Sequence, residues 1–416
     1  MRPSGRIASS GAAVLVCGWR EHFGQYRAAM AVNIATALST TRDPLAAGRE
    51  AAESAAQRLD GEAPELAFVF VSGSHLAAPE AVIEGIQDVL RPGALVGCGA
   101  GGVLGSRREL EAGTGLALWT ASFAGAGEVI PFHARLETEA GEARIAGFPD
   151  LDGARAVVLL ADPYTFPTDA VLAAIATGSP GLPVLGGLSS AHTATGSASL
   201  IFGDQIREEG AVGVCFRGVE VLPCVSQGAA PVGPEVTITA AEGNVIEELA
   251  GRPALETVER LIAQLPPRER GLVAGGLLIG IVIEGGKPEY EQGDFLVRGI
   301  VGADPESGRL TVGAVVHPGQ VVRLHARDAR SADEDLRQAL RVRLAALSDS
   351  GPAGALVFSC NGRGSAMFGR CDHDAEAVEQ ELGAPTAGFF AAGEIGPVGG
   401  RSFLHGFTAT VAVFGS

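Results

Sequence analysis

The feature that most constrains this fold is a repeated run of strand, helix and a second strand that ends in glycine. In its first occurrence the pattern predicts a strand at Leu66 to Ser72, an amphipathic helix at Ala78 to Leu90, and a strand that enters Gly97. The distance from the end of the opening strand to the first glycine is 25, 25 and 29 positions, from Ser72 to Gly97, Ala161 to Gly186 and Ser359 to Gly388. These matched spacings predict internal duplication of a domain-sized unit rather than a solenoid of short repeats.

The order of the predicted elements indicates an α/β fold. Strands follow strands with helices interspersed, which favours two lobes, each built on mixed β-sheets covered by helices. We expect residues 1–34 to be a disordered tail or to include translation upstream of a true start at Met30, with a transit-like segment as the alternative. Domains are expected at residues 35–250 and 251–416. The boundary at Gly251-Arg-Pro253 separates two predicted helices, Glu242 to Ala250 and Ala254 to Gln264.

Charge and composition limit the classes of partner that the protein is expected to bind. The net charge is −17, from 31 basic and 48 acidic residues, and no compact basic block interrupts it. Such a surface repels nucleic acid and anionic membranes, so neither is expected as a partner. The six cysteines show no metal-type spacing, which favours free thiols in a reducing compartment. No apolar run is long enough to span a bilayer, and we therefore expect a cytoplasmic protein without membrane insertion.

The sequence contains no complete cofactor-binding motif. Gly97-x-Gly99-x-x-Gly102 matches the letters of a dinucleotide fingerprint, but no long helix follows it. A Gly-x-x-x-x-Gly-Lys phosphate loop does not occur in the sequence. We therefore expect no cofactor.

The last sixty residues carry the densest set of polar groups between predicted strands. A buried strand, Ala355 to Ser359, runs into Cys360-Asn-Gly-Arg-Gly364, and a glycine-rich segment around Glu394 precedes a final strand. Loops at strand ends are where ligand sites gather in α/β proteins.

Three of these motifs resemble the C-terminal half of the FIST module. They are Phe358-Ser-Cys-Asn-Gly-Arg-Gly364, Gly388-Phe-Phe-Ala-Ala-Gly-Glu-Ile-Gly396 and His405-Gly-Phe-Thr408. The resemblance covers roughly residues 35 to 416, and it is looser in the N-terminal half. It implies a sensory domain of signal transduction that binds a small ligand, with amino acids or their derivatives as the suggested class. Because the resemblance fills the chain, a signal is expected to pass to a separate protein partner.

The leading candidate for binding is Arg363, whose guanidinium suits a carboxylate or phosphate. Asn361 beside it either orients the ligand or adopts a left-handed turn. Glu394 either accepts a ligand amine, which with Arg363 would clamp a zwitterion, or forms a structural ion pair with Arg363. Gly362 and Gly364 would bring the backbone close to the ligand.

Arg298 and His405 extend this candidate ligand site. Arg298 and Asp304 fall at strand and turn ends and are placed in the same cleft, with a solvated hairpin as the alternative. His405 is expected either to line the cleft or to form a structural hydrogen bond.

The rival prediction is an enzyme for acyl or amide transfer with Cys360 as nucleophile. It requires His405 or His373 within reach of the thiol, whereas most unpaired cysteines are inert core residues. Cys371-Asp-His-Asp374 offers possible metal ligands, but adjacent residues point apart, so we interpret it as a helix N-cap with an exposed His373. A protein-interaction adaptor is the third alternative, and it would need an exposed apolar patch.

Overall fold

The computed structural model describes residues 32–59, 61–139, 142–191, 199–290, 293–347 and 351–416. Of the predicted tail at residues 1–34, only its last three residues fall within these ranges, and Asn33 and Ile34 already belong to the first strand. Residues 1–31, including Met30, lie outside the described residues.

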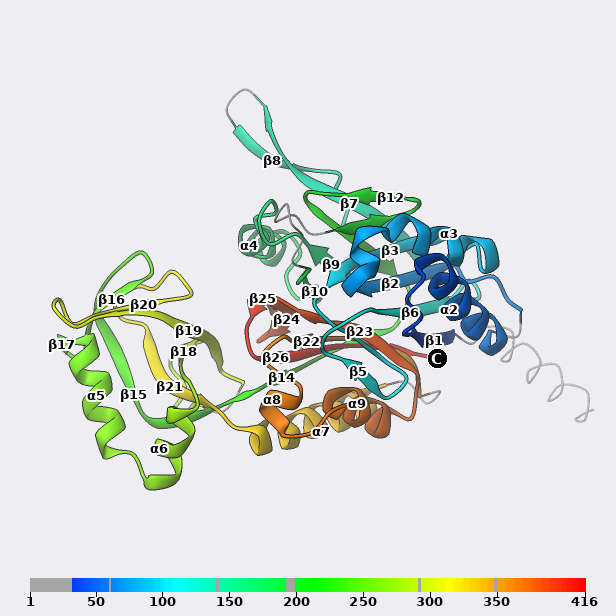
Figure 1. The fold of residues 1–416 in the computed structure, drawn as a ribbon. Helices are drawn as coiled ribbons and strands as arrows, with labels where there is room; N and C mark the ends of the chain where they lie inside the picture. Colours follow the sequence, from blue (N-terminus) through cyan, green and yellow to red (C-terminus); the bar gives the residue numbers. More distant parts are fainter. Residues whose placement is uncertain (1–31, 60, 140–141, 192–198, 291–292, 348–350) are drawn as a thin grey trace, which may run out of the picture.

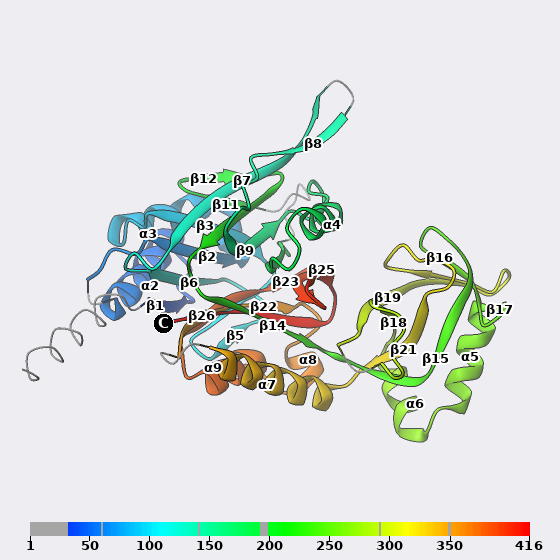
Figure 2. The ribbon, with the colours of Figure 1, turned by 180° about the vertical axis from the view of Figure 1, so that it is seen from behind.

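Two lobes make up the molecule, and both contain sheets with helices packed on them (Figure 1), which confirms the predicted α/β class. The large lobe holds residues 33–227 together with 329–416, and the small lobe holds residues 229–327. Figure 2 shows the two connections between them, where β14 continues into β15 and β21 leads into α7. The predicted boundary after residue 250 falls inside the small lobe, between β16 and β17.

Three sheets form the large lobe. In spatial order, sheet one contains β1 (Asn33–Ser39), β6 (Gly115–Ser122), β2 (Leu66–Ser72), β3 (Ala94–Ala100), β11 (Leu200–Phe202) and β12 (Gln205–Arg207). Sheet two contains β8 (Glu142–Ala146), β7 (Glu128–Glu139), β13 (Ala211–Arg217), β9 (Ala154–Ala161), β10 (Val184–Leu188), β24 (Glu394–Val398) and β25 (Arg401–His405). Sheet three contains β14 (Val221–Gln227), β26 (Thr408–Gly415), β22 (Pro352–Cys360), β23 (Thr386–Ala391), β4 (Val103–Gly105) and β5 (Arg108–Leu110).

The small lobe holds the fourth sheet. Its strands are β15 (Ala229–Glu242), β21 (Val321–Arg327), β18 (Leu277–Val282), β19 (Phe295–Asp304), β20 (Arg309–Val312), β16 (Val245–Leu249) and β17 (Arg252–Pro253). Its helices are α5 (Ala254–Gln264) and α6 (Pro267–Ala274). The large lobe carries α2 (Pro44–Arg58), the 3₁₀ turn η1 (Gly73–Ala77), α3 (Pro79–Val89), α4 (Thr168–Gly178), α7 (Ala329–Ala346), α8 (Ser365–Phe368) and α9 (His373–Leu382).

The three sheets of the large lobe share one pairing plan. Each has a central parallel pair (β2 with β3, β9 with β10, β22 with β23), flanked on one side by two antiparallel strands and on the other by a hairpin. The hairpins are exchanged in a cycle: the first, β4–β5, joins sheet three; the second, β11–β12, joins sheet one; the third, β24–β25, joins sheet two. The large lobe thus contains three similar structural units within one chain. Their origin by duplication stays a prediction.

The recurring glycines have a shared structural cause. Gly97, Gly186 and Gly388 each lie in the second parallel strand, and a Cβ there would collide with a carbonyl oxygen of the first strand. Since no side chain fits, the spacing noted in the sequence marks the same point in each sheet.

The unit sheets pack around one central core. Trp119 of sheet one contacts Phe414 of sheet three, with ring centroids 4.9 Å apart, and Phe216 of sheet two contacts the same Phe414. Helices α2 and α3, α4, and α7 and α9 cover the outer faces of the three sheets through separate apolar clusters. Large aromatic side chains gather in the central core, whereas the residues under the helices are mainly aliphatic.

Several predicted elements need correction. Glu242 to Ala250 is not a helix, because Gly243 turns at a φ of 60° and Val245–Leu249 pairs with β15 as strand β16. The apolar run from Leu272 to Glu284 predicts one strand, but β18 begins only at Leu277, since Pro267 starts helix α6 and Gly275 follows its end. The sequence offers Ser331 as the cap of a long helix from Asp328 to Leu347, whereas Asp328 is the observed cap of α7 and accepts the N–H of Arg330.

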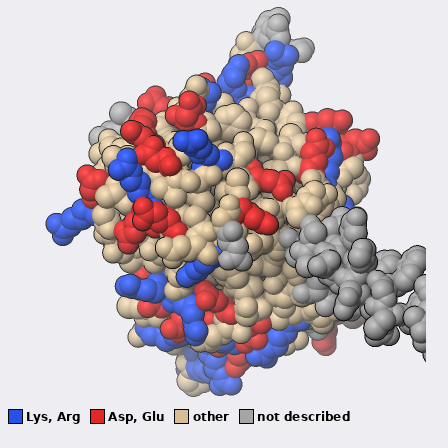
Figure 3. All heavy atoms as spheres, turned by 90° about the vertical axis from the view of Figure 1, so that its right-hand side faces the viewer, with Lys and Arg blue, Asp and Glu red and all other residues tan. Residues whose placement is uncertain are grey.

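Surface charge of both signs is spread over the exposed elements. Figure 3 shows one face of the molecule, on which acidic and basic side chains are interspersed. No helix in the described ranges is long and apolar enough to cross a membrane.

Candidate functional site

Arg363 lies in the loop after β22 and is bound by a carboxylate of the protein itself. Its Nε and Nη2 donate to the two oxygens of Asp374, at 2.6 and 2.8 Å, and both side chains are almost fully buried. Burial alone would favour the neutral acid, but the guanidinium holds the pKa of Asp374 well below its usual range. Arg363 therefore forms its structural ion pair with Asp374, and the predicted pair with Glu394 is wrong. The buried guanidinium presents no exposed surface to a ligand.

The residues beside Arg363 also serve local packing. A Cβ on Gly362 would meet the ring of Phe407, and one on Gly364, at a φ of 96°, would meet the carboxylate of Glu111. These glycines thus make room for other protein groups. Asn361 is not left-handed, contrary to one alternative; its N–H donates to Ala391 O at 3.0 Å and its side chain is exposed.

Cys360 is buried, and its thiol accepts the N–H groups of Gly362 and Phe407, at 3.4 and 3.3 Å. Burial, together with the neighbouring Glu394 carboxyl, raises the pKa of the thiol to about 12. Within the described ranges, Cys360 contacts no histidine: His405 Nε2 donates to Gly396 O and His373 lies between Asp374 and Asp333. A thiol that stays protonated and lacks an adjacent base is a poor nucleophile, so the geometry gives the enzyme alternative no support.

The Cys371 to Asp374 run begins helix α9 with Asp372 at the N-cap position, but the Asp372 side chain does not cap the helix and accepts the N–H of Glu109 instead. His373 is buried rather than exposed, because its ring stacks on Phe368 and both nitrogens contact carboxylates. No cluster of potential metal ligands occurs among the described residues.

Glu394 starts β24 and is fully buried. Its Oε2 accepts both the N–H and the hydroxyl of Thr408, at 3.0 and 2.8 Å, while no partner for Oε1 occurs in the described part of the chain. Burial raises the pKa of this carboxyl to about 7. The equivalent positions in the other two hairpins are Val103 and Leu200, so only the third hairpin places an acid here.

Arg298, on β19 of the small lobe, is half-buried and faces the large lobe. Burial lowers the pKa of Arg298, and Asp169 and Glu394 are the acids close enough to oppose that effect. Neither acid forms an ion pair with it, and among the described residues its one hydrogen-bond acceptor is the carbonyl of Val297. Asp304 does not share this place, since its carboxylate binds Ser307 in an exposed hairpin turn.

Next to these groups, the surface is hollowed in front of α4. This α4 hollow has a volume of about 360 Å³. Its lining comes from the loop before α4, the first turn of α4, β10 and β25: Pro163, Phe166, Pro167, Thr168, Asp169, Ala170, Leu188 and Leu404. Helix α4 begins after Pro167 with no side-chain cap. The N–H of Thr168 donates to Phe166 O, which leaves the N–H groups of Asp169 and Ala170 and the positive end of the helix dipole at the hollow.

The equivalent helix in sheet three is capped differently. There Glu109 of β5 accepts the N–H of Ala375, in the first turn of α9, at 2.9 Å. Burial, with Asp374 nearby, raises the pKa of Glu109 to about 7. The position in β25 that corresponds to Glu109 is Leu404, which is apolar. The α4 hollow therefore occupies the place where sheet three has its own carboxylate.

Asp169 and Leu404 were not singled out from the sequence. The sequence pattern predicts a helix over Thr168 to Ala176, but its missing cap is recognised only by comparison with an equivalent helix that has a cap. The pairing that brings Leu404 to α4 depends on hairpin exchange, which leaves no local sequence signal.

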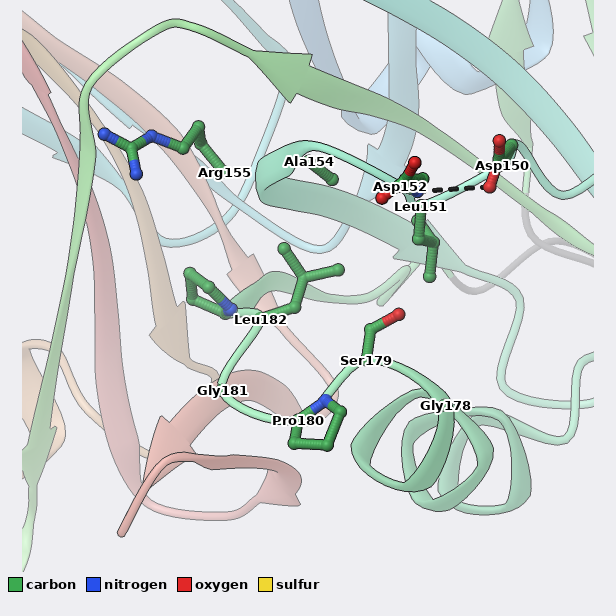
Figure 4. Close-up of a pocket in the computed structure, with 11 residues that line it drawn as sticks. Asp150, Leu151, Asp152, Ala154, Arg155, Gly178, Ser179, Pro180, Gly181 and Leu182 are labelled. Atoms are coloured by element: carbon green, nitrogen blue, oxygen red, sulfur yellow. Dashed lines mark hydrogen bonds between the residues drawn. The ribbon is translucent and has the colours of Figure 1, made fainter.

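A second hollow, of about 570 Å³, lies at the opposite, amino ends of β9 and β10 (Figure 4). Its charged side chains, Asp150, Asp152 and Arg155, are exposed, and Asp150 accepts the N–H of Asp152. Ligand sites of α/β sheets gather at the carboxyl ends of the strands, so the α4 hollow is the better candidate.

Comparison with known proteins agrees with this architecture. Residues 65–252 match the FIST N domain and residues 254–397 match the FIST C domain. Uncharacterized protein Rv0628c of Mycobacterium tuberculosis is 41% identical over 385 residues, which cover 92% of this chain and 100% of the relative. Uncharacterized protein Mb0898c of Mycobacterium bovis is 41% identical over 385 residues, covering 92% of this chain and 99% of that protein. With both domains matched in order and a relative matched over its full length, the chain belongs to the FIST family.

Proposed function

We propose that this protein is a small-ligand-binding sensor of signal transduction that takes an amino-acid-like or small anionic ligand in the α4 hollow. FIST domains are associated with sensing in signal transduction, and ligand class and site are our inference. The observation that carries the proposal is Arg298, a half-buried cation that faces two acids and is paired with neither.

An anionic group on the ligand would lie between Arg298 and the start of α4. Arginine binds carboxylate or phosphate through two parallel hydrogen bonds, and a helix N-terminus adds free N–H donors. In sheet three, Glu109 supplies a carboxylate of this kind to α9, which shows that the unit accommodates one. This arrangement gives to Arg298 the role that the sequence suggested for Arg363.

A cationic group on the same ligand would meet Asp169. That carboxylate is exposed, lines the hollow and is close to Arg298 without contacting it. Two opposite charges that face each other without contact suit a zwitterion, whose carboxylate and ammonium would bridge them. Buried Glu394 would then tune the charge of the site rather than contact the ligand.

The placement of Arg298 also suggests how binding becomes a signal. Arg298 belongs to the small lobe and α4 to the large lobe, so a ligand between them would favour one relative position of the lobes. One of the connecting segments leads directly into α7 through its cap Asp328. We infer that a separate cytoplasmic protein partner reads this position.

The proposal is tested by thermal unfolding against amino acids, small carboxylates and phosphates. A ligand at a hundred times its dissociation constant adds about 2.7 kcal/mol to the free energy of unfolding, which raises the Tm measurably. We expect at least one compound to do so in the wild type and not in Arg298→Gln.

Arg309→Gln is the matched control, because Arg309 lies in the same lobe but pairs with Glu247 on the surface. It should keep the full shift. A wild-type protein that no compound stabilises, or an Arg298→Gln variant with an undiminished shift, would refute the proposed site.

A further inference from the structure

Arg207, in the second strand of the exchanged hairpin β11–β12, is a half-buried cation without a partner. Its Nε is enclosed by protein and has no acceptor, and no ion pair or hydrogen bond reaches the side chain from any described residue. A buried donor left without an acceptor costs free energy, roughly 1–3 kcal/mol, so a bound group that supplied an acceptor would stabilise this side chain.

The side chain lines a hollow of about 780 Å³. This Arg207 hollow lies where β12 of sheet one meets β7 of sheet two. The other polar residues that line it are His133, Arg135, Thr165, Glu208 and Glu209. Its size falls within the range of small-molecule sites.

The position of Arg207 in the repeated plan relates this hollow to the site between the lobes. In the ladder of β11 and β12, Arg207 lies opposite Leu200, just as His405 lies opposite Glu394 in the ladder of β24 and β25. The two hairpins pair with β3 and β10 at the equivalent glycines, Gly97 and Gly186. The hollow is therefore the counterpart, in the first sheet, of the region around His405.

The neighbouring segments also correspond. His133 and Ala134 end the part of β7 that pairs with β13, and from Arg135 the strand leaves the sheet as a ribbon with β8. In sheet three the chain leaves at the equivalent position, Gln227, to form the small lobe. The Arg207 hollow is thus bounded by an exchanged hairpin and by the β7–β8 ribbon, which leaves sheet two where the small lobe leaves sheet three.

The charges of the hollow favour an anion at its inner end. The Arg207 Nε is buried, whereas Glu208 and Glu209 are exposed at the rim. Attraction to a partly desolvated guanidinium is stronger than repulsion from carboxylates that water screens. Arg135 adds a second guanidinium, although Glu137 already accepts one of its donors.

Two neutral donors complete the set. The Thr165 hydroxyl accepts the N–H of Gly210, which leaves its own hydrogen free to donate. His133 donates from Nε2 to Glu209 O at 3.0 Å, and this bond holds the turn that presents the rim.

We propose that the Arg207 hollow is a second ligand site, separate from the α4 hollow, that binds the phosphate or carboxylate group of a small organic anion. Arg207 is its principal cation, and Arg135 and the Thr165 hydroxyl are further donors. The planar guanidinium fork matches both oxyanions, so the two ligand classes share one recognition chemistry.

Calorimetric titration at low ionic strength tests the site, with inorganic phosphate, methyl phosphate, acetate and succinate as probes. We expect one of the phosphates or carboxylates to bind the wild type, and Arg207→Gln to weaken that binding at least about tenfold. Arg135→Gln, on an exposed ribbon, should weaken it less and provides a second variant should the first fail to fold.

Reciprocal variants keep this result distinct from that for the α4 hollow. Arg298→Gln should leave binding in the Arg207 hollow unchanged, and Arg207→Gln should leave any ligand of the α4 hollow unaffected. Loss of the same binding event in both variants would mean a single site and would overturn the proposal. Binding of none of the probes, or equal binding by Arg207→Gln and wild type, would also overturn it.

Discussion

Glu109 and Leu404 occupy equivalent positions beside the first turns of two equivalent helices, yet only Glu109 caps its helix. Glu109 accepts the N–H of Ala375 in α9, while Leu404 lines the hollow in front of the uncapped α4. This difference between equivalent positions supports the proposed binding of an oxyanion in front of α4, and neither the sequence pattern nor a single sheet would reveal it.

Leu404→Glu should fill that place with a carboxylate from the protein. We expect the variant to fold, to gain a few tenths to about 1 kcal/mol from the helix dipole, and to lose the ligand-induced rise in Tm. Leu404→Gln, similar in shape but uncharged, is the matched control and should retain part of the rise. Full retention by Leu404→Glu would contradict the placement of the ligand anion.

The buried pair of Arg363 and Asp374 should be structural. Arg363→Met leaves the Asp374 carboxylate without its main partner in the interior, so we expect the free energy of unfolding to fall by about 3–5 kcal/mol in urea titrations. Arg330→Gln, which breaks the exposed pair with Glu334, should lower the free energy of unfolding far less, because water screens that pair. Similar losses in the two variants would show that the buried pair contributes no more to the free energy of unfolding than an exposed pair.

Glu394 should make stability depend on pH. Its pKa is about 7 in the fold, above its ordinary value of 4.5, so the folded protein keeps a proton that the unfolded chain releases between these values. Its contribution is therefore present below pH 4.5 and is lost as pH rises to 7, on the order of 1–3 kcal/mol.

Two buried histidines act in the opposite direction. Burial lowers the pKa of His325 and His405 to about 4, so their contribution grows as pH rises from 4 to 6.5. The test is thus the difference between wild type and Glu394→Gln in urea unfolding at pH 4.5 and 7.5. Wild type should lose more stability than the variant over this interval, and parallel profiles would exclude the assigned role.

Cysteine labelling should separate Cys360 from Cys371. Cys371 is exposed, whereas Cys360 is buried with a pKa of about 12, so iodoacetamide at pH 7.5 should modify Cys360 at least about tenfold more slowly. Peptide mass spectrometry on the folded protein reports the two sites separately. Rapid modification of Cys360 would reopen the nucleophile hypothesis.

Local elements were largely readable from the sequence. Leu66 to Ser72 and Ala254 to Gln264 have the predicted bounds, because apolar spacing and β-branched content decide them locally. The turn at Gly243 was missed, since its short acidic strand resembles an amphipathic helix. The shared position of Gly97, Gly186 and Gly388 was visible as a spacing because one steric demand acts at all three.

The candidate site was predictable only in part. Arg298 and Glu394 were named from their places at strand ends, and both lie at the junction of the lobes. The sequence favours Arg363 as the ligand-binding cation because no local signal shows that Asp374, eleven positions later in the chain, forms an ion pair with it. Leu404 and Arg207 reach their sites through hairpin exchange, which pairs strands from different units and leaves no local pattern. Asp169 lies on α4, whose missing cap is recognised only by comparison with the capped α9.

The most direct measurement is a calorimetric titration of the compound that gives the largest rise in Tm, into wild type and Arg298→Gln. The account predicts saturable binding to wild type at one site, and an affinity at least about tenfold lower in Arg298→Gln. Equal affinities for the two proteins would contradict the claim that Arg298 binds the ligand's anion.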